Sequence, residues 1–378
     1  MTPPASTFSD SKQHYIILDA LRGIAAVLVL IFHVFETFAL GDPFKQIVNH
    51  GYLAVDFFFM LSGYVIGYAY DDRWNKMSLG GFFKRRLIRL HPMIIMGMIT
   101  GAIMFYFQAS DTVFPSIAGT PVWQVLLTML IGFTLIPLPP SLDIRGWTEM
   151  HPLDGPAWSL FFEYIGNILY ALALRKMSNK VLAVFVAACA ILFAHLALTK
   201  GDVIGGWSFT LPQLHIGFAR LLFPFAGGLL LSRVMKPWKI KGAFAWSGLL
   251  LITVLSLPRF GTAETVWING LYETIVVVIF FPLIVQIGAS SISGNALSKS
   301  IASFLGEISY PLYITHYAFI YTFTAWVANN EVSLSSATPM ALVVIFGSII
   351  YAYLCLKFYD IPVRKWLTKR FSPKISNS

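Results

Sequence analysis

Two pairs of ionisable residues lie on one face of the first apolar segment, residues 17–39. His33 and Arg22 are eleven residues apart, which leaves them about 20° apart in rotation and roughly 16 Å apart along a helix axis. Asp19 precedes Arg22 by three residues, and Glu36 follows His33 by three, so each has a carboxylate within pairing range. An imidazole beside a carboxylate is suited to general-base or nucleophilic catalysis, although a lone intramembrane histidine can also be a hydrogen-bonded core residue.

More ionisable residues interrupt the later apolar segments. They are Asp56, Glu163, Arg220 and His316. An ionisable group inside a membrane span is costly to insert, so each indicates a functional site. We expect them, with His33, between the membrane mid-plane and the outer surface. Glu36, Asp56 or Glu163 can orient the His33 ring and stabilise its cation, and the sequence does not choose among the three.

A second chemistry is suggested by the basic run that holds Lys84, Arg85, Arg86 and Arg89. Guanidinium groups bind phosphate oxygens in bidentate fashion, so this run predicts a phosphate-binding zone at the inner membrane surface. On charge alone it can equally be an anchor that sets topology. The sequence therefore indicates an inner cationic zone and an outer acid–base zone.

The composition of the chain is that of a membrane protein. The 378 residues are 57% hydrophobic and only 12% charged, with mean hydropathy +0.70. Apolar runs of nearly twenty residues, enough to cross a hydrocarbon core of ~30 Å, recur near 17–39, 52–70, 91–108, 122–138, 157–174, 180–199, 213–232, 243–257, 269–288, 308–328 and 339–357.

The net charge, the cysteines and the first residues of the chain exclude several kinds of protein or site. The net charge of +9 fits basic cytoplasmic loops and does not indicate nucleic-acid binding. Cys189 and Cys355 lie in apolar runs without CxxC spacing, so we expect small buried residues and no metal site. The polar residues before Tyr15 do not read as a cleaved signal peptide.

Basic clusters near 84–89, 175–180, 233–241 and 357–370 should all face the cytoplasm. Three apolar runs separate the first two clusters, so one run must not cross. The weakest is 122–138, because it ends in Pro137, Pro139 and Pro140. We therefore predict an all-α polytopic membrane protein of about ten transmembrane helices plus one re-entrant or interfacial segment, with both termini cytoplasmic. The predicted parts are a cytoplasmic segment 1–14, a transmembrane domain 15–358 and a basic tail 359–378.

Six segments together resemble the acyltransferase-3 family of membrane acyltransferases. They are LDALRGIAA (18–26) with His33 after it, GYLAVDFFFMLSG (51–63), FFKRRLIRLHP (82–92), WSLFFE (158–163), FLGEISYPLYITH (304–316) and YDIPVR (359–364). Two positions depart from the family pattern: Tyr164 stands where a second acid is common, and Asp360 where Glu is usual. The resemblance is to the form without a fused esterase-like domain.

The resemblance implies an O-acyltransferase that moves an acyl group, usually acetyl, from cytoplasmic acyl-CoA to a carbohydrate or glycolipid hydroxyl at the outer side of the plasma membrane, or inner membrane in a Gram-negative source. No metal cofactor is implied. The resemblance also implies that the catalytic residues are His33, Glu36, Asp56 and Glu163. Acyl-CoA binding is expected at Arg22, Arg86, Arg89 and Lys84. An acceptor-contacting or supporting role is expected for Trp158, Ser159, Arg220, Tyr310 and His316.

Two other classes compete with this interpretation. A proton-coupled transporter also carries intramembrane His, Asp and Arg, but transporters commonly contain inverted repeats, which the sequence does not display. A purely structural scaffold has no need for five buried ionisable residues. The acyl group, the acceptor and the oligomeric state are not determined by the sequence.

Overall fold

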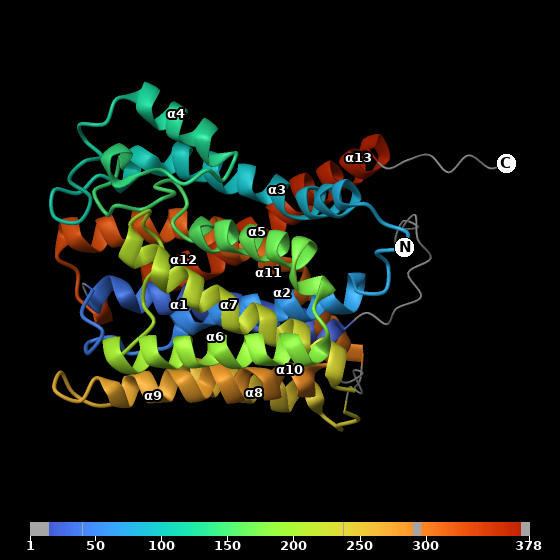
Figure 1. Cartoon of the computed structure of the whole chain (residues 1–378). Coiled ribbons are helices and arrows are strands. Elements are labelled where there is room, and N and C mark those ends of the chain that lie inside the picture. Colours follow the sequence, from blue (N-terminus) through green and yellow to red (C-terminus); the bar gives the residue numbers. More distant parts are fainter. Residues whose placement is uncertain (1–14, 40, 237, 290–295, 372–378) are drawn as a thin grey trace.

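The computed structural model describes residues 15–39, 41–236, 238–289 and 296–371. In this part of the chain there is no β-strand, and the long helices lie side by side in a bundle (Figure 1). The α-helices are α1 (Ile16–Ala39), α2 (Ala54–Tyr70), α3 (Leu79–Met104), α4 (Val122–Gly132), α5 (Ala157–Leu172), α6 (Asn179–Lys200), α7 (Leu211–Val234), α8 (Ala243–Ser256), α9 (Trp267–Ile275), α10 (Phe281–Gly288), α11 (Ala296–Asn330), α12 (Leu334–Cys355) and α13 (Ile361–Phe371).

Eight helical stretches among the described residues are long and apolar enough to cross a membrane. They are Ile16–Ala39, Gly51–Tyr70, Leu79–Gln108, Ala157–Lys176, Asn179–Lys200, Leu211–Val234, Trp267–Gly288 and Leu334–Phe371. The two other predicted runs are also helical, as the 14-residue α8 and the 35-residue α11. The predicted all-α polytopic membrane fold is therefore confirmed, and all ten predicted runs are found as helices.

The predicted non-crossing run, 122–138, contains the short helix α4. It has 11 residues and so extends about 16 Å, well short of a hydrocarbon core of ~30 Å. The chain leaves the helix after Gly132, and Pro137 and Pro139 lie in non-helical backbone before a short 3-10 turn begins at Pro140. Figure 1 shows α4 at one edge of the bundle, above α3. Length alone therefore keeps this segment from being a full span.

Glycines allow the central helices to pack backbone against backbone. A Cβ placed on Gly63 of α2 would lie 1.9 Å from the Phe225 carbonyl oxygen of α7, and one on Gly228 of α7 would lie 2.0 Å from the Met60 carbonyl oxygen. Gly23 of α1 approaches the backbone of α11 in the same way. Small residues at such crossings are the usual means of close helix association in membranes. The α1–α11 and α2–α7 pairs thereby hold the ionisable segments of the sequence in fixed register.

Two helices continue through single π-helical turns. Val276–Phe280 joins α9 to α10, and Leu356–Asp360 joins α12 to α13. Such turns are uncommon and often occur at functional sites. The second one carries Asp360, which lines a cavity.

Candidate active site

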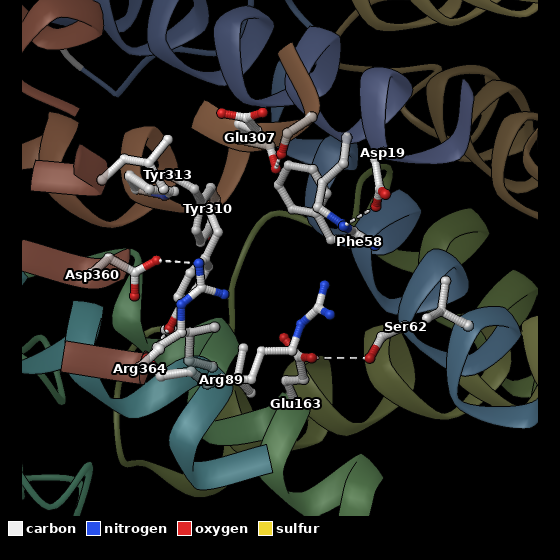
Figure 2. A pocket seen from close by; sticks show the side chains of 18 of the residues that line it. Asp19, Phe58, Ser62, Arg89, Glu163, Glu307, Tyr310, Tyr313, Asp360 and Arg364 are labelled. Atoms are coloured by element: carbon white, nitrogen blue, oxygen red, sulfur yellow. Dashed lines mark hydrogen bonds and ion pairs between the residues drawn. The ribbon is translucent and has the colours of Figure 1, made fainter. Parts of the chain in front are cut away.

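A basic cavity of about 750 Å³ opens between α1, α2, α3, α5, α11 and the α12–α13 junction (Figure 2). Its charged lining residues are Asp19, Arg22, Arg86, Arg89, Glu163, Glu307, Lys357, Asp360, Arg364 and Lys365. Positive charges outnumber negative ones in this set, and most of the positive charges are guanidinium groups. We call this space the basic cavity.

Most of the cationic side chains in the basic cavity are already paired. Salt bridges join Arg22 to Asp19 (2.8 Å), Arg86 to Glu163 (2.6 Å), Arg364 to Asp360 (2.8 Å) and Lys357 to Glu307 (2.9 Å). These pairs fix the directions of the side chains around the opening seen in Figure 2.

Arg89 differs from its neighbours. It is exposed, lines the cavity, and makes no ion pair with any residue that the structure describes. Its guanidinium is therefore free to receive an anionic group, and a fork of N–H donors is well matched to phosphate. The predicted grouping of Arg22, Arg86 and Arg89 around one space is found.

Lys84 is placed differently from the prediction. Its side chain is exposed, donates a hydrogen bond of 3.1 Å to the Phe371 carbonyl, and does not line the basic cavity. Residues two positions apart project about 160° apart around a helix, so Lys84 cannot face the cavity together with Arg86. The prediction that it takes part in the same site is wrong in its geometry.

Glu163 does not orient His33, contrary to one of the predicted alternatives. Its carboxylate accepts hydrogen bonds from Arg86 (2.6 Å) and from the Ser62 hydroxyl (3.0 Å), inside the basic cavity and away from His33. The prediction measured its depth from the start of the apolar run. Residues 149–160 are all buried, so α5 begins inside the protein and Glu163 lies deeper than its distance along the helix suggests.

A second space surrounds His33. Two hollows of about 590 and 420 Å³ share His33, Glu36 and Trp207 among their lining residues. We call the two together the His33 chamber. Its shared walls also include Phe32, Tyr52, Trp147, Ile204 and Tyr317, so aromatic faces enclose only a few polar groups. This composition is typical of a site for an uncharged or weakly charged small-molecule group.

His33 and Glu36 form the predicted pair. Nδ1 of His33 lies 2.6 Å from Oε2 of Glu36. A carboxylate accepts, so this contact places the ring proton on Nδ1 and leaves Nε2 as the acceptor. The ring is held by Tyr317, 4.6 Å between centroids, and stacks on His316 at 5.6 Å. Of the three candidate carboxylates, Glu36 is thus the one that orients His33.

Asp56 has another partner. Oδ2 of Asp56 lies 2.7 Å from an Arg220 terminal nitrogen, and both side chains are almost completely buried. Arg220 also donates to the carbonyls of Tyr52 (2.7 Å) and Gly205 (3.1 Å) and lies over the Trp158 ring. The suggestion that Asp56 orients the His33 ring is therefore wrong: its carboxylate is occupied by Arg220. Arg220 and Trp158 do line the His33 chamber.

The remaining predicted residues are His316, Ser159 and Tyr310, and none of them lines the His33 chamber. His316 is fully buried behind His33, with Nδ1 2.9 Å from the Tyr313 carbonyl. Ser159 and Tyr310, for which an acceptor-contacting or supporting role was predicted, both line the basic cavity. The Ser159 hydroxyl is 2.8 Å from the Tyr313 hydroxyl. Helix α5 starts at depth, which explains why Ser159 lies on this side.

The two spaces meet at Tyr313. This residue and Val55 line both the basic cavity and the smaller hollow of the His33 chamber. The Phe58 ring packs against Tyr313 with 5.1 Å between ring centroids. The side chains of Tyr313 and Val55 therefore form a wall that the two spaces share.

Sequence reasoning missed several lining residues. Asp19 was noted only as a partner of Arg22, and the following had no predicted site role: Ser62, Trp147, Glu149, Trp207, Tyr317, Tyr321, Asp360 and Arg364. Some lie on loops, where the helical period gives no direction. Arg364 and Asp360 were visible as a motif, but only the path of α13 brings them to Arg22. Within the described ranges no cluster of His, Cys, Asp and Glu is arranged as a metal site, and both cysteines are buried.

Comparison with known proteins shows which family the chain resembles. The acyltransferase-3 family model, described as an acyltransferase domain, matches residues 15–357. Protein 2 in picA locus of Rhizobium radiobacter is 31% identical over 48% of this chain and 95% of its own length. O-acetyltransferase OatA of Staphylococcus aureus is 22% identical over 94% of this chain, which spans 58% of the length of OatA. No solved structure matches the chain.

Proposed function

The chain belongs to the acyltransferase-3 family, and on this premise we propose that it transfers an acyl group, most simply acetyl, from cytoplasmic acyl-CoA to a hydroxyl of a carbohydrate or glycolipid. The observation that carries the proposal is the His33–Glu36 pair, 2.6 Å apart, in a chamber that shares Tyr313 with the basic cavity. The resemblance to OatA, an O-acetyltransferase, supports the same chemistry.

The basic cavity is suited to the donor. Coenzyme A carries several negative charges on its phosphates, and the free guanidinium of Arg89 lies beside fixed arginines. A volume of about 750 Å³ is in the usual range for sites that enclose a small molecule. We expect the phosphates at Arg89 and Arg364, with the thioester end directed past Tyr313 toward His33.

The His33 chamber is suited to the acceptor. Nε2 of His33 takes the proton from an acceptor hydroxyl, and the resulting oxygen attacks the thioester carbonyl carbon. The C–S bond breaks, the acyl group stays on the acceptor oxygen, and the imidazolium returns its proton to the coenzyme A thiolate. Glu36 stabilises the imidazolium, as the acid does in hydrolase triads. A two-step route gives the same overall reaction: the acyl group is first transferred to His33, with release of coenzyme A, and then to the acceptor hydroxyl.

The orientation in the membrane follows from this division. Coenzyme A is a cytoplasmic compound, so the end of the bundle that holds the start of α1 and the α12–α13 junction is assigned to the cytoplasm, together with both chain termini. The His33 chamber then faces the outer side of the plasma membrane. The acceptor is a surface carbohydrate or its lipid-linked precursor.

A detergent assay without a membrane gradient tests the proposal. Purified protein is mixed with acetyl-CoA and a mixture of glycans from the outer surface of the source cells. We expect release of the coenzyme A thiol together with acetylated glycan detected by mass spectrometry. If acetyl-CoA remains intact in the presence of every glycan fraction, the acyltransferase proposal fails. Transport without chemistry would then be the better account of the buried charges.

A further inference from the structure

Glu149 is a carboxylate in the His33 chamber that no sequence motif indicates. It lies on the non-helical segment between α4 and α5, has 5% exposure, and lines the smaller hollow together with His33 and Glu36. The helical period cannot predict its direction, because the residue is not on a helix. The chamber therefore contains a second acidic group besides the one that orients the histidine.

The loop that presents Glu149 is held in a fixed conformation. The Asp143 carboxylate accepts hydrogen bonds from the backbone N–H groups of Arg145 (3.0 Å), Gly146 (2.8 Å) and Thr148 (2.7 Å). Gly146 has φ +104°, a conformation that glycine adopts without strain. The adjacent Met150 N–H donates to the Trp207 carbonyl at 2.8 Å. These hydrogen bonds fix the backbone on both sides of Glu149 and so set where its side chain starts.

The close approach of Gly155 makes room for this carboxylate. A Cβ on Gly155 would lie 3.0 Å from Oε1 of Glu149 and 2.7 Å from the Tyr321 hydroxyl. Gly155 lines the same hollow. Any side chain at this position would press on Glu149 and Tyr321 together, so the loop before α5 is shaped around the carboxylate.

The carboxylate is only partly satisfied by the protein. The Tyr321 hydroxyl donates to it, with both carboxylate oxygens at 2.6 Å. Arg145 is 3.7 Å away, and its Nε is committed to the Pro152 carbonyl at 2.9 Å. An ionised carboxylate offers about four lone-pair sites. Glu149 therefore retains capacity for further donors on the side of the hollow.

The charge state of Glu149 suits a binding role. Burial raises the pKa of Glu149 to about 7, while the nearby Arg145 guanidinium opposes this shift. Near neutral pH the group can accept a hydrogen bond from a hydroxyl as a carboxylate or donate one as an acid. The ionised form is the stronger acceptor for an alcohol hydroxyl, and a neutral amide at this position would not replace it.

We propose that Glu149 binds a second hydroxyl of the acceptor, adjacent to the hydroxyl that His33 deprotonates, so that the chamber selects polyhydroxylated acceptors over simple alcohols. This inference rests on the proposed function. Trp147 and Trp207, which line both hollows, provide flat apolar faces for the ring of such an acceptor. Glu149 is here a specificity-determining residue, and His33 remains the base.

The test compares Glu149→Gln with the parent on two acceptors. Methyl glucoside supplies neighbouring hydroxyls, and tetrahydropyran-2-methanol supplies a single one on a similar ring. We expect kcat/KM for methyl glucoside to fall about 10- to 100-fold, the range for a lost hydrogen bond to a charged group. The value for tetrahydropyran-2-methanol should stay within about twofold, because it makes no second hydrogen bond.

A binding measurement keeps the inference independent of turnover. Quenching of tryptophan fluorescence by methyl glucoside, in protein purified in detergent without acetyl-CoA, reports acceptor binding directly. The same loss of affinity is expected in Glu149→Gln, whereas Glu264→Gln, which changes an exposed acid in the loop before α9, should match the parent. A parent that binds methyl glucoside but releases no thiol from acetyl-CoA would contradict the proposed function and leave the role of Glu149 supported.

Two results would overturn the inference. Equal losses on both acceptors would show that Glu149 only maintains the loop. Unchanged affinity for methyl glucoside in Glu149→Gln, or failure of the parent to bind it more tightly than tetrahydropyran-2-methanol, would show that no second hydroxyl is bound. Tyr321→Phe adds a structural control: it removes the donor to Glu149 while keeping the carboxylate, so preference for methyl glucoside should persist.

Discussion

The basic cavity and the His33 chamber are built in opposite ways. The basic cavity is lined by side chains from long helices, and nearly all of its many charges lie in ion pairs that face the opening. The His33 chamber is lined mainly by aromatic rings, and part of its wall comes from the non-helical segments around Trp147 and Ile204. Arg220 in its wall pairs with Asp56, and both of these side chains are almost completely buried.

Under the proposed function, this difference separates donor binding in the basic cavity from proton transfer in the His33 chamber. A polyanionic donor is held by many contacts, each of which is partly screened and individually modest. Proton transfer depends on one imidazole in a site of low polarity, where a single contact has a large effect. Substitutions in the two regions should therefore differ in size and in the step that they affect.

The largest effect is expected at His33. In His33→Gln the side chain keeps its approximate size but loses basicity, so the transfer rate should fall about 10²- to 10⁴-fold. Affinity for acetyl-CoA, measured by equilibrium binding, should remain within about twofold, because the donor contacts are assigned to the basic cavity. His215→Gln, at an exposed position of α7, is the matched control. A variant that transfers at the parent rate would move the base to another residue.

The next effect concerns folding. Asp56→Asn leaves the buried Arg220 without its counter-ion, which should lower stability by about 3–5 kcal/mol. Thermal unfolding in detergent reports the change. Asp42→Asn breaks an exposed contact with Lys45, 3.4 Å apart, and should lower stability by less than about 1 kcal/mol. Similar losses of stability in the two variants would mean that burial does not raise the contribution of the Asp56–Arg220 pair.

A smaller effect is expected at Arg89. Removing this free guanidinium in Arg89→Ala should raise KM for acetyl-CoA about 10- to 100-fold with little change in kcat. Arg89→Lys should recover only part of the loss, because an ammonium lacks the planar fork. The split between KM and kcat is the informative readout. A fall in kcat with unchanged KM would remove Arg89 from the donor site.

The smallest effect is expected at Lys84, and it tests the boundary of the basic cavity. Lys84 donates to the Phe371 carbonyl and is not part of the lining, so Lys84→Ala should leave KM for acetyl-CoA within about twofold of the parent, as for most surface changes. It retains Arg86 and Arg89 and so provides the paired comparison for the Arg89 variants. A tenfold rise in KM would extend the donor site to the start of α3.

The sequence alone determined the class of the protein and its local pairs. Apolar runs predict the helices, because in hydrocarbon every backbone polar group must be hydrogen-bonded within the helix. The positions of the basic clusters then predict which run does not cross. Spacing of three residues along α1 predicts Arg22–Asp19 and His33–Glu36, both of which are found at 2.8 and 2.6 Å. These features depend only on the period of a single helix.

Only the tertiary structure decided which distant residues meet. The depth at which α5 begins places Glu163 beside Arg86 and not beside His33, and the packing of α7 against α2 gives Asp56 to Arg220. Glu149 reaches the His33 chamber because a hydrogen-bonded loop turns inward. No helical or strand period governs a loop, and helix depth depends on how neighbouring segments pack, so neither could be read from spacing along the chain.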